Sequence, residues 1–111
     1  MELQTEANGD VLVVTLSGRL DAVTAPDYET KIRELIDANN NKLVIDFATL
    51  EYISSAGLRG LLLTAKLLKA KNGQICLANP DGNVKSVFDM SGFSALFKMA
   101  DSIDSALRSI A

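Results

Sequence analysis

The sequence predicts a single α/β domain, residues 1–111, in which a mixed β-sheet begins with an antiparallel hairpin and helices pack against the sheet. Three observations predict this class. A length of 111 residues suits one domain with a core of its own. Short apolar runs rich in β-branched residues alternate with stretches in which apolar residues recur every three or four positions, which favours parallel strands joined by helices. A turn dipeptide between the first two strand-like segments indicates the hairpin.

The N-terminal part predicts the hairpin and one helix. Asn8-Gly9 fits a two-residue type I′ turn, so residues 2–7 and 10–17 should pair antiparallel. Thr24 is placed to cap the helix that follows, because its side-chain oxygen can accept a hydrogen bond from a first-turn N–H. This helix should end within the polar run at residues 39–41.

The central part predicts a strand, a helix and another strand. Residues 42–47 form an almost continuous apolar run, which is typical of a buried strand. Apolar residues recur at helical spacing over residues 58–68, and Asn72-Gly73 should end that helix. Residues 74–78 are again a short apolar strand, which makes the unpaired Cys76 a core residue.

The C-terminal part predicts two further helices around a short extended stretch. Residues 84–88 begin a helix that should end before Gly92. Residues 97–99 are expected to be extended, and the apolar spacing of residues 103–110 indicates a last helix that docks on the sheet.

The composition excludes several classes of enzyme. The chain has no His, so neither a Ser-His-Asp nor a Cys-His nucleophile pair can form. Its single Cys cannot supply a zinc site, and a carboxylate site for Mg²⁺ or Ca²⁺ is the one kind of metal site left open. We therefore expect no catalytic residue, no bound metal and no cofactor.

The distribution of charged residues indicates which classes of partner the chain can bind and in which compartment it works. The net charge is −3, with 10 acidic and 4 basic residues in 1–51 but 4 acidic and 7 basic residues in 52–111. This balance argues against a general nucleic-acid-binding surface. No charge-free segment approaches the ~20 residues that span a bilayer, and no signal peptide is evident, so we expect a cytoplasmic protein without a membrane partner. The basic residues Arg59, Lys66, Lys69 and Lys71 fit either a solvated helix face or an acidic protein partner.

Two adjacent serines stand out in the expected loop at residues 49–58. Ser54 and Ser55 occupy cap positions, where a serine that accepts a first-turn N–H stabilises a helix by about 1 kcal/mol. The same helix start offers unpaired N–H groups and a partial positive charge, which tolerate a phosphate. Ala56 and Gly57 leave little side-chain bulk to block an approaching enzyme. A structural cap and a modified serine are both compatible with this pattern.

Residues 53–58, Ile-Ser-Ser-Ala-Gly-Leu, resemble the turn that marks the STAS domains of bacterial anti-sigma factor antagonists, Asp-Ser-Ser/Thr-Gly-Leu. The resemblance extends over the chain: residues 16–21 are similar to the first loop of the family, residues 44–46 to its central strand and residues 90–97 to its late helix-turn. Ser54 stands where the family has Asp, and Ala56 stands at its second hydroxyl position.

This resemblance implies a partner-switching protein that is not an enzyme. The unphosphorylated domain would bind a serine-kinase anti-sigma factor and free the sigma factor. Phosphorylation of a turn serine would dissolve that complex, and a cognate phosphatase would reset it. The phosphorylated serine of the family maps onto Ser55, with Ser54 as the second choice. The implied docking surface comprises Asp21, Ser54, Ser55, Ala56, Gly57, Leu58 and Arg59.

Three alternatives remain open. The chain could be a STAS scaffold, or an interaction subunit of a signalling assembly, that is never phosphorylated. It could be a receiver-like domain in which Asp46, expected at the end of a central strand, accepts a phosphate with Mg²⁺. A serine hydrolase would need Lys as its base, and the segment around Ser55 lacks the Gly-x-Ser-x-Gly pattern.

Overall fold

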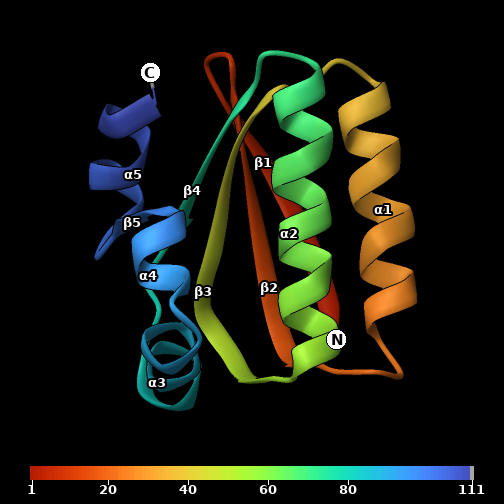
Figure 1. The fold of residues 1–111 in the computed structure, drawn as a ribbon. Coiled ribbons are helices and arrows are strands. Elements are labelled where there is room, and N and C mark those ends of the chain that lie inside the picture. The colour runs from red at the N-terminus through yellow and green to blue at the C-terminus, as the bar shows by residue number, and fades with distance from the viewer. Residues whose placement is uncertain (111) are drawn as a thin grey trace.

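The computed structural model describes residues 1–110 and contains the predicted mixed sheet with helices packed against it (Figure 1). Ala111, the last residue of the expected domain, lies outside the described residues. Within residues 1–110, five strands form one sheet in the order β1-β2-β3-β4-β5. β1 pairs antiparallel with β2, and the later neighbours pair parallel, which confirms the α/β class. The strands are β1 (Glu2–Asn8), β2 (Val11–Leu20), β3 (Lys42–Ile53), β4 (Gln74–Ala78) and β5 (Lys98–Ala100).

The helices lie on both faces of the sheet. In Figure 1, α1 and α2 stand side by side in front of the sheet. They share one buried core with α3, while α5 covers the opposite face over a smaller core that includes Cys76. Cys76 is therefore a core residue, as predicted. The helices are α1 (Ala25–Asp37), α2 (Ser55–Ala70), α3 (Gly82–Ser91), α4 (Phe93–Leu96) and α5 (Ile103–Ile110), of which the short α4 is not predicted from the sequence.

The β1–β2 turn lies one residue later than predicted. Asn8 pairs with Val11, so the two loop residues are Gly9 and Asp10 rather than Asn8 and Gly9. Gly9 has φ +63°, whereas Asp10 is not among the residues with positive φ. A type I′ turn requires positive φ at both loop positions, so a glycine followed by Asp fits a type II′ turn instead.

Strand β3 is the largest departure from the prediction. It runs from Lys42 to Ile53 instead of ending at residue 47, and α2 begins at Ser55, so the expected loop at residues 49–58 is wrong. The pairing of β3 with β2 shifts twice, and at each shift β3 contains one extra residue. Such bulges break the regular alternation by which a half-buried strand is recognised in a sequence.

Candidate functional site

The two segments that carry the predicted site meet where β2 and β3 end together. Leu20 and Ile53 form the last register pair of these strands. Directly after this pair, the Ser54 N–H donates to the Leu20 carbonyl oxygen at 2.9 Å. Asp21 and Ser54 each follow a member of that pair, so the structure brings the β2–α1 turn and the start of α2 to the same edge of the sheet.

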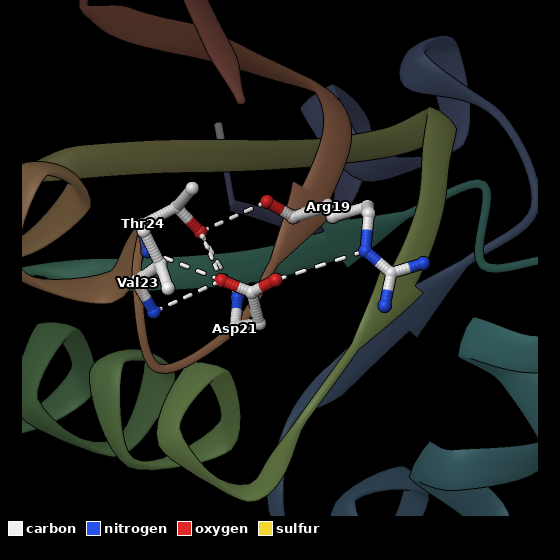
Figure 2. Close-up of polar contacts among 4 residues, drawn as sticks. All are labelled: Arg19, Asp21, Val23 and Thr24. Carbon is white, nitrogen blue, oxygen red and sulfur yellow. Dashed lines mark hydrogen bonds and ion pairs between the residues drawn. The ribbon is translucent and has the colours of Figure 1, made fainter.

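The Asp21 carboxylate organises the β2–α1 turn (Figure 2). Its Oδ1 accepts the N–H of Val23 at 3.0 Å and the N–H of Thr24 at 3.2 Å. The bond from the Thr24 N–H is the largest of the causes that hold the pKa of Asp21 below its ordinary value. The carboxylate is consequently charged at neutral pH, and the turn has a fixed shape.

Thr24 occupies the N-cap position of α1, as predicted, but its hydroxyl does not cap the helix. The hydroxyl turns back into the β2–α1 turn, where it accepts the Asp21 N–H at 2.9 Å and donates to the Arg19 carbonyl oxygen at 2.9 Å. The predicted position of Thr24 is therefore confirmed, but the predicted hydrogen bond from a first-turn N–H to its hydroxyl is wrong. Its side chain instead makes the turn that presents Asp21 more rigid.

Arg19 and Tyr52 form a pair beside Asp21 that is not predicted from the sequence. The Arg19 guanidinium lies over the Tyr52 ring, 4.3 Å from its centroid, and Arg19 Nε lies 3.7 Å from Asp21 Oδ2. These two residues face each other only because of the second bulge in β3. The Arg19 side chain is 61% exposed, so its ion pair with Asp21 contributes little to stability. The stacked Arg19 and Tyr52 side chains nevertheless form part of the surface beside Asp21.

Val23, in the same turn, is a further surface residue that the sequence patterns missed. Its side chain is 86% exposed although it is large and apolar. Single exposed apolar residues are common, so its place beside Asp21, rather than its exposure alone, makes it a candidate contact residue. The spacing of apolar residues carried no sign of it, because Val23 lies outside any helix or strand.

Ser54 is the N-cap residue of α2, but its hydroxyl makes no cap. Its backbone is extended, with φ −100° and ψ 177°, and its carbonyl oxygen accepts the Leu58 N–H at 2.9 Å. The Ser54 hydroxyl oxygen has less than 1 Å² of exposed surface and no hydrogen-bond partner within residues 1–110. The predicted side-chain cap at Ser54 is therefore wrong. The hydroxyl is turned inward, where solvent and a modifying enzyme do not reach it.

Ser55 is the first residue of α2 and is exposed, as is Arg59 one turn later. Ala56 and Leu58 are half-buried between them. The first turn of α2 contains no acidic residue, whereas α1 has Asp27 in its first turn. The first turn of α2 therefore supplies no carboxylate of its own to the positive end of the helix dipole.

Gly57 faces the interior rather than the surface. A Cβ atom at this position would stand 2.7 Å from Ile53 Cγ1 and 2.8 Å from the Leu20 carbonyl oxygen. Only glycine lets α2 approach the ends of β2 and β3 this closely. The structure thus places Gly57 beneath the predicted docking surface, where it supports the position of Ser55.

Asp46 lies within β3 rather than at its end, and its carboxylate oxygens accept three hydrogen bonds from neighbouring groups. Oδ1 accepts the Ala48 N–H at 3.0 Å and the Asn79 side-chain amide at 2.9 Å, and Oδ2 accepts the Thr15 hydroxyl at 3.4 Å. The residue is only 6% exposed. Asp46 therefore holds the first bulge of β3 together, which removes the basis for the receiver-like alternative.

Residues 1–110 contain neither a cluster of metal-ligating side chains nor a helix able to span a membrane. In this part of the chain, no three or more His, Cys, Asp or Glu side chains are grouped so that they could hold a metal ion. Nor does any helix here combine the length and the apolar character that crossing a membrane would require.

Comparison with known proteins connects this geometry to a family. BtrV of Bordetella bronchiseptica, a candidate anti-sigma factor antagonist, is 34% identical over 106 residues, which cover 96% of this chain and 91% of BtrV. The anti-sigma F factor antagonist of Paenibacillus polymyxa is 28% identical over 108 residues, covering 96% of this chain and 92% of that protein.

The fold comparison agrees with the sequence comparison. The crystal structure of an anti-sigma factor antagonist from Mycobacterium paratuberculosis superimposes with a TM-score of 0.89 at 28% identity, covering 98% of this chain and 92% of the other. The family model described as STAS domain matches residues 2–106. Because this match spans nearly the whole chain and includes both segments of the site, the chain belongs to the STAS-domain family.

Proposed function

We propose that this protein is an anti-sigma factor antagonist whose binding is switched by phosphorylation of Ser55. In its unphosphorylated form it binds a serine-kinase anti-sigma factor, and the sigma factor is released. The kinase phosphorylates Ser55, the complex dissociates, and a cognate phosphatase restores the binding form. The chain is the substrate in this cycle and supplies no catalytic group. The antagonist role is supported by the names of two relatives.

The observation that carries this proposal is the exposed position of Ser55 at the first residue of α2, beside the Asp21 turn. A kinase must reach the hydroxyl oxygen of its substrate. The Ser54 oxygen is inaccessible unless the helix start moves, since less than 1 Å² of it is exposed. Accessibility therefore favours Ser55 over Ser54.

The electrostatics of the helix start favour a phosphate at Ser55. A phosphoserine carries about −1.5 to −2 charges at neutral pH. The N-terminal N–H groups and the dipole of α2 stabilise such an anion, and no acidic residue in the first turn opposes it. Arg59, one turn further on, adds a positive charge on the same helix. The helix is thus expected to persist while the surface around Ser55 gains the negative charge of the phosphate.

The proposed docking surface combines a rigid turn with the first two turns of α2. The Asp21 turn supplies a charged carboxylate and the exposed Val23, and the helix supplies Ser55 and Arg59. The half-buried side chains of Ala56 and Leu58 add apolar surface between Ser55 and Arg59. Gly57 lets α2 pack closely against Leu20 and Ile53, which fixes the position of the helix. A phosphate within this surface excludes a partner by charge and by bulk.

The test of the modification site is mass spectrometry after incubation with ATP and serine-kinase anti-sigma factors from the same cell. The wild type and Ser54→Ala should each gain one phosphate, and Ser55→Ala should gain none. Phosphate on Ser54→Ala and Ser55→Ala alike, or its loss in Ser54→Ala only, would contradict the assignment to Ser55. No phosphate on any form would favour the alternative of a non-phosphorylated STAS scaffold.

The test of the switch is binding of the same kinases to Ser55→Asp and Ser55→Ala. Ser55→Asp should weaken binding about tenfold or more, because it adds a charged group that must be desolvated in an interface formed with a neutral serine. Ser55→Ala should bind as the wild type does. Circular dichroism of the phosphorylated protein should show unchanged helix content, and a clear loss of helix would mean that the switch acts by unfolding instead.

A further inference from the structure

A second surface, separate from the Ser55 docking surface, is shaped as a groove. Its volume is about 430 Å³, and it lies between the middle of α2, the start of β4 and the connection from α4 to β5. Within residues 1–110, β5 pairs with Cys76–Ala78. The first two residues of β4, Gln74 and Ile75, extend beyond that pairing and border the groove.

The walls of this groove expose apolar side chains. Leu62 on α2 is 44% exposed and Leu96 at the end of α4 is 69% exposed, and both line the groove. Ile75 and Phe97 continue the apolar lining between them. Two exposed apolar side chains from segments distant in the sequence thus meet at one groove.

The rim of the groove is positively charged. α2 carries Arg59, Lys66 and Lys69 and no acidic residue. Because Lys66 and Lys69 follow Leu62 by four and seven positions, they lie on the same exposed face of the helix as the groove wall. Lys98 also borders the groove, but its Nζ turns toward α5 on the other face of the sheet, where it donates to Gln74 Oε1 at 3.4 Å and to the Ser109 carbonyl oxygen at 3.1 Å. Among the described residues, neither Asp nor Glu lines the groove.

We propose that this groove docks an acidic amphipathic segment of a protein partner. The segment inserts apolar side chains between Leu62 and Leu96 and places its carboxylates against Lys66 and Lys69. An amphipathic helix laid into an apolar groove is a common way to recognise a peptide, and the cationic rim selects an acidic segment over a basic one. Leu62 lies about 10 Å along α2 from Ser55. None of the described residues that line the groove belongs to the proposed Ser55 docking surface, so we infer that the two sites are occupied independently.

The test uses the full chain and two matched peptides of about 15 residues, long enough to form a helix. Both carry Leu at helical spacing, and the remaining positions are mainly Glu in one peptide and mainly Lys in the other. In a nuclear magnetic resonance titration, the Glu peptide should produce saturable shifts at the amides of Leu62, Ile75 and Leu96. Equal binding of the Lys peptide, shifts confined to another surface, or no saturable shift would overturn the proposal.

Variants make the test specific to the groove. Leu62→Gln and Leu96→Gln should each weaken binding of the Glu peptide about tenfold, because each removes an apolar contact. Lys69→Glu should weaken it most strongly at low salt, where charges are least screened. Met90→Gln is the matched control, since Met90 is 87% exposed and does not line the groove, and it should bind as the wild type does.

Two outcomes separate this proposal from the Ser55 switch. Ser55→Asp should change binding of the Glu peptide less than twofold if the groove is an independent site. A loss as large as that of Leu62→Gln would show that the peptide occupies the Ser55 docking surface, and it would overturn the second site. Failure of Ser55 phosphorylation, in contrast, leaves the expected peptide binding unchanged.

Discussion

The two segments that meet at Ser55 are held in place in opposite ways. Side-chain hydrogen bonds hold the β2–α1 turn, through the Asp21 carboxylate and the Thr24 hydroxyl. The start of α2 has no side-chain cap, and the hydroxyl of Ser54 has no partner within residues 1–110. Packing of Gly57 and of the buried face of α2 positions it instead. A phosphate on Ser55 therefore has no side-chain cap to break at the start of α2.

Leu61→Ala tests the packing side of this comparison and should have the largest effect. Leu61 is fully buried on the inner face of α2. Large-to-small changes at such positions cost about 2–5 kcal/mol, because they remove apolar contacts and leave a cavity. Urea denaturation should show this loss, and Leu68→Ala, equally buried on the same face, should behave alike. A neutral result for either variant would mean that α2 is oriented differently.

Gly57→Ala tests the close approach at the helix start. The added methyl group would meet the Leu20 carbonyl oxygen and the Ile53 side chain, so we expect a loss of about 1–3 kcal/mol in unfolding free energy. Gly60→Ala, on the same helix, is the control. Its added methyl group would meet the Tyr28 ring at 3.2 Å and Glu29 Cγ at 3.9 Å but no backbone atom among these contacts, and alanine favours the helix by about 1 kcal/mol over glycine. Equal losses in the two variants would show that the Gly57 contact is not special.

The sequence predicted the parts of this fold in which periodicity is undisturbed. The hairpin, α1, β4 and α5 follow from runs and spacings that their packing preserves. The end of β3 was missed because two bulges break its alternation, although Thr49, Tyr52 and Ile53 are residues that favour strands. The pairing of Arg19 with Tyr52 depends on the same bulges, so no local pattern could reveal it.

The candidate site was predicted in its location but not in its hydrogen bonds. Ser54, Ser55 and Asp21 lie at one edge of the sheet, and the resemblance to the STAS family, rather than the spacing of strands and helices, had grouped them. Capping preference assigned hydrogen bonds to Thr24 and Ser54 that neither hydroxyl makes. The Thr24 hydroxyl bonds within the β2–α1 turn, and the Ser54 hydroxyl is buried without a partner among residues 1–110. A preference derived from isolated helices includes neither of these surroundings.

Acid titration tests the hydrogen-bonded side of the comparison. The pKa of Asp21 is lowered, chiefly by the Thr24 N–H bond, so its carboxylate stabilises the fold at pH values above the ordinary value of about 3.9. That contribution should be lost as the pH falls through the lower, folded-state pKa. The difference in unfolding free energy between the wild type and Asp21→Asn should therefore be constant near neutral pH and shrink in strong acid. A difference that is independent of pH would show that the carboxylate charge does not hold the turn.

Ser54→Ala has the smallest expected effect and tests the comparison most directly. Removing a hydroxyl that caps a helix costs about 0.5–2 kcal/mol, whereas removing a buried hydroxyl without a partner leaves stability unchanged or raises it by up to about 1 kcal/mol. Asp81→Ala is the matched control, because the Asp81 side chain does accept an N–H, that of Gly82 at 2.8 Å, at the start of α3. Denaturation curves should show a loss only for Asp81→Ala. Equal losses would mean that Ser54 caps α2 in solution, and the packing-held helix start that makes Ser55 available for modification would have to be abandoned.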